Sequence, residues 1–329
     1  MKLGLTVIIC ALLCRLGGIL LLPVVQFIAK PEVASFLLYL ETGRVVKLEI
    51  GPTESLQTEP TIQTEVTQPP SEQIRFQQDD AQLVQLRAHC TYPVDVEAML
   101  MTDLVWNLTK ETPTVLIVHS HATESYTPTP ESGYLETAPY RTLDEAYNMI
   151  RVGEELQKAL QNFGIIALHD TTLHDYPSYT DAYINSRKTV ETYLAQYPTI
   201  SLVVDLHRDA VEGVGNSQLT THAEVNGSAC AQLMLVVGSN ASGRTHPDWE
   251  KNMALAVKLH TQLEKRFPGI CRPISFRTER FNQDLSPGAL LIEVGAAGDT
   301  IEDALQAVWA LADGIADLAQ GTATADSTN

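Results

Sequence analysis

Two alternating patterns of apolar and polar residues run along the C-terminal part of this chain. Short runs that are almost wholly apolar stand at residues 115–118, 165–168, 202–206, 232–237 and 290–294. Longer segments with apolar residues at helical spacing stand at residues 143–163, 181–196, 248–267 and 300–320. Strands that are buried on both faces and alternate with amphipathic helices are typical of a parallel sheet. The pattern therefore predicts an α/β fold, a mostly parallel sheet with helices on both faces.

The N-terminus shows a different pattern, one continuous apolar stretch. Besides its glycines and a proline, only Thr6, Arg15 and Gln26 interrupt residues 3–29. Such a stretch is long enough to cross a hydrocarbon core of about 30 Å. A cleaved secretory signal is the alternative, but Gln26-Phe-Ile-Ala29 lacks a small residue at the proper place for cleavage. We therefore expect residues 1–29 to be a signal anchor that spans the cell membrane once, with the rest of the chain on the extracytoplasmic side.

Composition divides the remainder of the chain into segments. Residues 51–86 are rich in Thr, Glu, Gln and Pro and hold few large apolar residues, which is typical of a disordered stalk. A short membrane-proximal element at 30–50 precedes this stalk, and a lead-in segment at 87–112 follows it. We expect one globular domain at 113–320 and a disordered tail at 321–329.

The charge and the cysteines exclude some classes of function. The net charge of -18 argues against a nucleic-acid partner, because phosphate binding needs clustered Lys and Arg. Cys90, Cys230 and Cys271 have no C-x-x-C spacing, so neither a thiolate zinc site nor a dense disulfide framework is indicated. His260 is expected on an exposed helix face and is given no role in a site.

Three side chains that could bind a metal follow or end predicted strands. The first strand leads into His121 and Glu124, an H-x-x-E pair, and another strand ends at His207. Zinc hydrolases use three such ligands and leave the fourth position open for water. Because the carboxyl ends of parallel strands meet at one edge of a sheet, we predict a Zn²⁺ site formed by these three residues.

Two more polar residues lie at the same strand ends. Glu293 ends the apolar run that begins at Ala289, where a carboxylate is costly to bury without a partner. It is the best candidate for the catalytic general acid and base. Arg208 directly follows His207, and its guanidinium suits a substrate carboxylate or a developing oxyanion. The catalytic residues predicted from the sequence are therefore Glu293 and Arg208.

Several motifs together resemble one family, the stage II sporulation protein P family of membrane-anchored peptidoglycan hydrolases, related to zinc N-acetylmuramoyl-L-alanine amidases. The resemblance covers about residues 113–318. Ser120 stands where the family's His-Thr-His motif has threonine, which changes no ligand. The motifs that carry the resemblance are His119–Tyr126, Asn148–Gly153, His169–Tyr179, Asp205–Ala210, Arg280–Gly288 and Leu291–Gly295.

The resemblance implies a zinc amidase-like fold and cleavage of the N-acetylmuramoyl-L-alanine amide during spore engulfment. It leaves open whether peptide cross-links are cut as well. It also implies two partners, a lytic transglycosylase and a membrane scaffold protein. Alignment with the amidases favours His121 as ligand over His119, which is then an alternate ligand or an orienting residue. The classical amidases place their glutamate at the start of the next helix, so Asp144 and Glu145 remain alternatives to Glu124.

Two other functions are compatible with the same residues. A zinc carboxypeptidase-like peptidase would share the ligands but would need a pocket for a terminal carboxylate. A catalytically inactive wall-binding module would have no reason to keep a general base beside a metal. The segment 169–187 is dense in His, Asp, Tyr and Arg, which suits either a groove for sugar and peptide or a packed loop.

Overall fold

The computed structural model describes residues 76–323 except 105, 109–110, 131–132 and 211–217. Its centre is a seven-stranded sheet in the order β1-β8-β7-β9-β4-β2-β3. Only β7 and β9 pair antiparallel, and every other neighbouring pair is parallel. The predicted mostly parallel sheet is therefore confirmed. The strands are β1 (Leu86–Ala88), β2 (Val115–Val118), β3 (Ala167–His169), β4 (Leu202–Asp209), β7 (Leu233–Val237), β8 (Ile274–Phe276) and β9 (Ala289–Ala296). A separate hairpin consists of β5 (Ala223–Val225) and β6 (Ser228–Cys230).

The helices follow the predicted alternation, with one shifted start. The α-helices are α4 (Val96–Met101), α5 (Met149–Asn162), α6 (Ala182–Gln196), α7 (Trp249–Arg266) and α8 (Ile301–Ala323). Helix α5 begins at Met149 and not near 143, because Asn148 caps it by accepting the Ile150 N–H at 2.9 Å. The residues just before it form a turn in which Asp144 accepts the Ala146 N–H at 3.1 Å. Short 3-10 helices lie at Gln78–Leu83, Tyr179–Asp181 and Gln283–Leu285.

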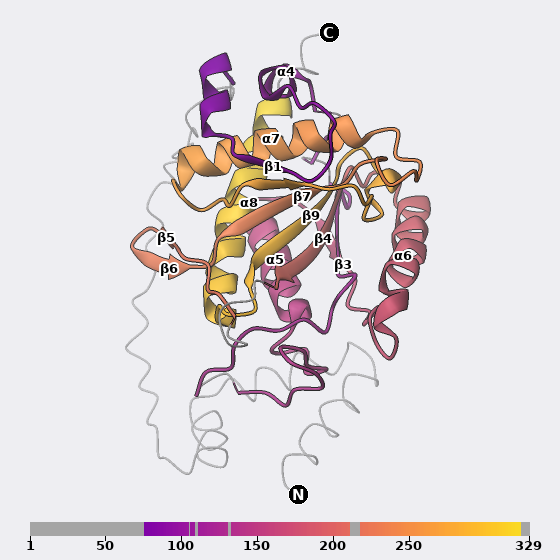
Figure 1. Cartoon of the computed structure of the whole chain (residues 1–329), viewed down its shortest axis with the longest axis vertical. Coiled ribbons are helices and arrows are strands. Elements are labelled where there is room, and N and C mark those ends of the chain that lie inside the picture. The colour runs from indigo at the N-terminus through magenta and orange to yellow at the C-terminus, as the bar shows by residue number, and fades with distance from the viewer. Residues whose placement is uncertain (1–75, 105, 109–110, 131–132, 211–217, 324–329) are drawn as a thin grey trace, which may run out of the picture. The chain divides into compact units, whose positions relative to one another are not determined.

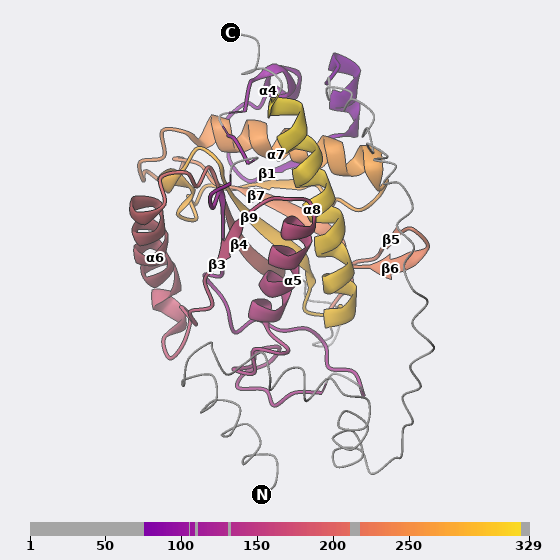
Figure 2. The ribbon, with the colours of Figure 1, turned by 180° about the vertical axis from the view of Figure 1, so that it is seen from behind.

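Helices cover the two faces of the sheet unequally. Val115 and Ile117 of β2 point into the large core, which α5, α7 and α8 share. Leu116 and Val118 point the other way, into a smaller core that includes Val190 of α6. This is the period of two that every strand imposes on its side chains. Figures 1 and 2 show α5 beside α8 on one face and α6 apart from them on the other side.

Regular structure begins well before residue 113. Gln78–Leu83 is helical, β1 pairs with β8, and Leu100 of α4 is fully buried in the large core. The Lys258 ammonium also donates to the Leu100 carbonyl at 2.5 Å, which ties α4 to α7. The folded part therefore includes segments that composition assigns to the stalk and the lead-in. The elements at this end are short, so their periodicity gave no usable signal.

The expected membrane anchor at residues 1–29 lies outside the described residues, as does most of the predicted stalk. None of the helices in the described part of the chain is long and apolar enough to cross a bilayer.

Candidate active site

Polar side chains from two neighbouring strands meet on the α6 side of the sheet. Val203 of β4 belongs to the smaller core, so Asp205 and His207, two and four residues further on, point to the same side. His207 is in register with Glu293 of β9, which places these two side chains next to each other. The alternation within one buried strand thus delivers a carboxylate and an imidazole to one face.

Glu124 reaches this group from the loop after β2. Its Oε2 lies 3.6 Å from His207 Nδ1 and accepts the Arg208 backbone N–H at 3.4 Å. Its Oε1 lies 3.2 Å from Nη2 of Arg141. Burial opposes ionisation of this carboxyl, but Arg208 and His207 lower the pKa of Glu124 to about 2. The loop therefore presents an ionised carboxylate to His207.

Each of the two predicted histidine ligands has a carboxylate near one ring nitrogen. His207 Nε2 lies 2.9 Å from Asp205 Oδ1, and His121 Nδ1 lies 3.8 Å from Asp175 Oδ2, beyond hydrogen-bonding range. The two rings meet edge to face with their centroids 5.4 Å apart. Burial by itself would lower the pKa of His207, but Asp205 and Glu124 raise it well above its usual value. A protonated His207 ring is thus favoured in the described structure, because its positive charge lies between the carboxylates of Asp205 and Glu124.

The donor set of this site fits a zinc ion. Two imidazoles and a carboxylate are zinc ligands, and ligand histidines usually have a carboxylate behind them, as Asp205 stands behind His207. The Nδ1 atom of His121 is buried without a hydrogen-bond partner among the described residues. Within the described ranges, no three or more His, Cys, Asp or Glu already form a group that could hold a metal ion. Arg141 and Arg208 both lie close to the Glu124 carboxylate, so a zinc ion would compete with them for its oxygens. Zinc binding therefore stays a prediction.

His119 lies on the opposite face of the sheet from this site. Its Nδ1 lies 3.0 Å from the Leu206 carbonyl oxygen, and its Nε2 lies 2.8 Å from His169 Nε2. Burial and the neighbouring His169 lower the pKa of His119 to about 3, so its ring is neutral at neutral pH. The side chain supports the backbone of β4 one residue before His207, as an orienting residue does.

The alternative carboxylates lie elsewhere. Asp144 and Glu145 are exposed in the turn that precedes α5. The structure thus brings Glu124 to His207 and leaves these two side chains in solvent. Which carboxylate binds a metal stays a prediction.

Glu293 is held beside His207 with part of its carboxyl group unused. Its Oε2 is buried and has no hydrogen-bond partner among the described residues. Burial raises the pKa of Glu293 to about 8. The next residue is fixed by Tyr126, whose hydroxyl donates to the Val294 carbonyl at 2.8 Å. Glu293 as a residue is half-buried, so its carboxyl, with one buried and unpaired oxygen, is suited to exchange a proton with a ligand in the site.

Arg208 makes its contacts inside the protein. Its Nε donates to the Ser125 carbonyl and its Nη2 to the Tyr140 carbonyl, both at 2.9 Å. Its Nη1 lies 3.7 Å from Glu124 Oε1. These contacts fix the loop that carries Glu124. The predicted contact of Arg208 with substrate stays a prediction.

Sequence reasoning gave no individual role to several residues at this site, two of which, Asp175 and Tyr179, lie in the segment 169–187. Arg141 bridges Glu124 and Asp175, with Nη1 2.8 Å from Asp175 Oδ2. Tyr179 stacks on His121 at 4.4 Å between centroids and lies under the Arg141 guanidinium at 4.6 Å. Asp205 could have been found, because it precedes His207 by two residues in one strand. Arg141 and Asp175 come from loops, and nothing in their local sequence shows which strand end they approach.

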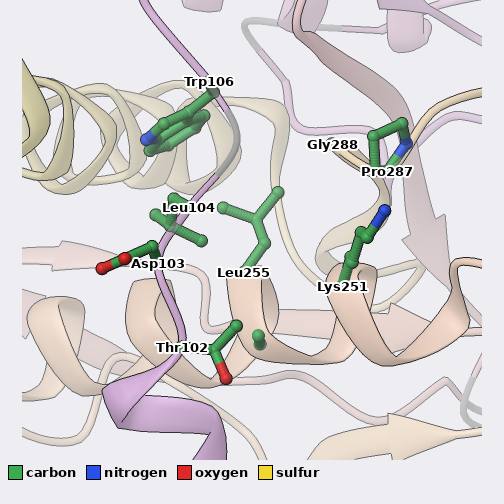
Figure 3. Close-up of a pocket in the computed structure, with 9 residues that line it drawn as sticks. Thr102, Asp103, Leu104, Trp106, Lys251, Leu255, Pro287 and Gly288 are labelled. Atoms are coloured by element: carbon green, nitrogen blue, oxygen red, sulfur yellow. The ribbon is translucent and has the colours of Figure 1, made fainter.

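A separate narrow crevice lies away from the site (Figure 3). It stands near the start of β9 and not at the strand ends that carry the site, and its volume is about 20 Å³. Trp106, Leu104, Leu255 and Lys251 are among the side chains that line it. A cavity of this size holds about one water molecule, so it is too small to be the substrate site.

Comparisons with known proteins point to one family. A family model described as stage II sporulation protein P matches residues 30–316. The stage II sporulation protein P of Bacillus subtilis (strain 168) is 28% identical over 258 residues, which cover 74% of this chain and 60% of that protein. The match thus spans less than two thirds of the relative's own length.

Two solved structures that resemble this one are amidases. They are the CwlD amidase from Clostridioides difficile in complex with the GerS lipoprotein and the N-acetylmuramoyl-L-alanine amidase AmiC2 of Nostoc punctiforme. Their sequences are 12% and 14% identical to this chain, with TM-scores of 0.39 and 0.35. The likeness covers 65% and 64% of this chain and 100% and 96% of theirs, respectively.

Proposed function

The chain belongs to the stage II sporulation protein P family, and from this premise we propose that it is a zinc-dependent peptidoglycan hydrolase. The bond cut is the amide between N-acetylmuramic acid and L-alanine. The observation that carries the proposal is the convergence of His121, Glu124 and His207 with Glu293 at one end of the sheet.

The chemistry follows from what each of these side chains can do. His121, Glu124 and His207 would hold the zinc ion. When bound, zinc polarises a carbonyl group and lowers the pKa of water. Glu293 takes the proton of the attacking water as its oxygen adds to the amide carbon, and then delivers a proton to the nitrogen that leaves. The products are a lactyl carboxylate on muramic acid and a free L-alanine amino group.

Other residues keep these groups in place. Asp205 orients the His207 ring through the 2.9 Å contact, and Arg208 fixes the loop of Glu124. A cation near Glu293 favours its ionised form, which a general base needs. The site therefore supplies ligands, a proton carrier and the side chains that orient them.

Catalysis explains Glu293 better than wall binding alone. A binding module gains nothing from a buried carboxyl that lacks a partner for one oxygen, because burial of this group is costly. A carboxypeptidase would need a cation for the terminal carboxylate of its substrate. Among the described residues of the site, Arg141 is paired with Glu124 and Asp175, and Arg208 donates to backbone carbonyls. The amidase is therefore the function that we favour.

The setting of this activity is part of the proposal. Residues 1–29 anchor the chain in the cell membrane, with the hydrolase on the extracytoplasmic side, where peptidoglycan lies. The hydrolase works during spore engulfment with a lytic transglycosylase and a membrane scaffold protein. In the experiment below, new ends at the peptide cross-links would show that it cuts these bonds as well.

The test is to incubate the full-length chain with intact sacculi and identify the new ends by mass spectrometry. Glycan strands freed of peptide serve as the control. We expect new L-alanine amino groups and peptide-free muramic acid from sacculi, and no new ends from the control glycan. New reducing sugar ends would instead show a glycosidase, and release of single C-terminal amino acids would show a carboxypeptidase; either result would overturn the proposed function.

A further inference from the structure

A strained turn lies next to the site, within the segment Arg280–Gly288. Phe281 and Asn282 have φ angles of 49° and 58°, in the left-handed region. A bulky non-glycine residue there is a genuine outlier, and such residues persist only where their surroundings hold them. Asp284 provides that hold, because it accepts two hydrogen bonds from Arg187, at 2.9 and 3.0 Å, and pairs with Arg280 at 3.1 Å.

The strained turn fixes Tyr183 in the first turn of α6. Asn282 Nδ2 donates to the Tyr183 carbonyl at 2.8 Å. The Phe281 ring packs against the Tyr183 ring with centroids 5.9 Å apart. Both residues of the turn therefore contact Tyr183: Asn282 contacts its backbone, and Phe281 contacts its ring.

The Tyr183 ring touches both predicted histidine ligands. It stacks nearly parallel to His207, at 6.4 Å and 12°, and meets His121 edge to face, at 5.4 Å and 90°. Its hydroxyl has no hydrogen-bond partner among the residues that the structure describes. A phenol carries its proton at neutral pH and donates it readily in a hydrogen bond.

The same turn also reaches His207 through a chain of hydrogen bonds. Asn282 Nδ2 lies 3.2 Å from Ser186 Oγ, which lies 2.7 Å from Ser120 Oγ. Ser120 donates to Asp205 at 2.6 Å, and Asp205 contacts His207 at 2.9 Å. The turn thus sets the positions of Tyr183 and His207 together.

We propose that Tyr183 is a further catalytic residue, whose hydroxyl donates a hydrogen bond to the carbonyl oxygen of the amide that is cut. This inference rests on the proposed function. Negative charge develops on that oxygen as water adds to the amide carbon, and a fixed donor stabilises it. Tyr183 keeps its own proton throughout, and no bond forms or breaks at the phenol. The proton that moves is the one that Glu293 carries.

The experiment compares Tyr183→Phe with the wild-type full-length chain on solubilised glycan–peptide fragments. Phenylalanine keeps the ring and its contacts with both histidines and removes only the hydroxyl. We expect kcat to fall roughly a hundredfold, the usual scale for loss of one such donor, with KM, zinc content and unfolding midpoint unchanged. Tyr197→Phe, at the other end of α6, removes a phenol hydroxyl away from the site and should leave kcat unchanged.

A second variant tests the turn itself. Asn282→Gly tolerates the backbone conformation but removes the bonds to Tyr183 and Ser186, so kcat should fall roughly tenfold without loss of folding. A Tyr183→Phe chain with wild-type kcat would overturn the inference and leave the proposed function intact. A Tyr183→Phe chain that loses zinc would also overturn it, by making Tyr183 a support of the metal site. A wild-type chain that releases no peptide would overturn both.

Discussion

His207 and Glu293 stand side by side in neighbouring parallel strands, paired in register. His207 has an imidazole between two carboxylates, and Glu293 has a carboxyl with one buried oxygen that lacks a hydrogen-bond partner among the described residues. The two are 86 positions apart in the sequence, and only the pairing of β4 with β9 brings them together. This pairing places an imidazole, a side chain of the kind that binds metals, next to a carboxyl that could carry a proton, and the proposed hydrolysis of an amide needs both.

The two predicted histidine ligands are tested by removing them one at a time. His121→Ala and His207→Ala should each abolish stoichiometric zinc binding and hydrolysis, because a site of three protein ligands loses its geometry with either gone. Metal content of the purified full-length variants is the measurement, with release of peptide from sacculi alongside. Stoichiometric zinc in either variant would remove that residue from the ligand set.

The choice between carboxylates is tested in the same way. Glu124→Ala should lose zinc, whereas Asp144→Ala and Glu145→Ala should keep it, because of these three carboxylates only Glu124 lies beside His207. The exposed pair are matched controls for the loss of one negative charge. A Glu124→Ala chain that retains zinc while one of the other two loses it would place the ligand in the turn before α5.

The histidine pair behind the site depends on a glycine. A Cβ atom at Gly153 would lie 2.5 Å from Nε2 of both His119 and His169. Gly153→Ala should therefore lower the free energy of unfolding by about 1 to 3 kcal/mol, although alanine favours helices over glycine by about 1 kcal/mol. Thermal unfolding of the full-length chain measures this, with exposed Glu154→Ala as the control in the same helix. Equal stability of Gly153→Ala and wild type would show that the histidine pair can move apart.

Acid should destabilise the fold through buried His260. Burial lowers the pKa of His260, and the nearby Glu264 only partly opposes this. The folded chain therefore binds a proton at this ring less readily than the unfolded chain does, so stability falls as the pH drops below about 6.5, the pKa of an unperturbed histidine. Chemical unfolding at pH 7 and pH 5 should show a shallower loss for His260→Gln than for wild type. The exposed His222→Gln is the control, and an unchanged slope for His260→Gln would contradict this assignment.

Much of the site could be predicted because its residues follow apolar strands. His207 and Glu293 lie within buried runs, and parallel strands bring their carboxyl ends to one edge whatever the loops do. The position of Glu124 is harder to predict, because it lies in a loop. The contacts of that loop with Arg208 hold Glu124 against β4. The alternation of side chains within β4 also predicts that Asp205 points to the same face as His207.

The features that sequence reasoning missed have physical reasons. Strands β1 and β8 have three residues each, too few to show a period, and the direction of β7 against β9 depends on the connections between strands. The expectation that His260 lies on an exposed helix face is wrong, because α7 is packed against α4 and α8 as well as the sheet. Tyr183 belongs to the segment 169–187, which suits either a groove or a packed loop, and only the packing of α6 shows that its ring lies on His207.

The Glu293→Gln variant tests the proposed chemistry most directly. Glutamine preserves the shape and the hydrogen-bonding reach of the side chain but cannot take up the proton. Zinc content, binding to sacculi and release of peptide are measured on the same preparation of full-length chain. We expect normal zinc content and normal binding, with turnover lower by roughly a hundredfold or more. Near-normal turnover would contradict the assignment of Glu293 as the group that moves the proton.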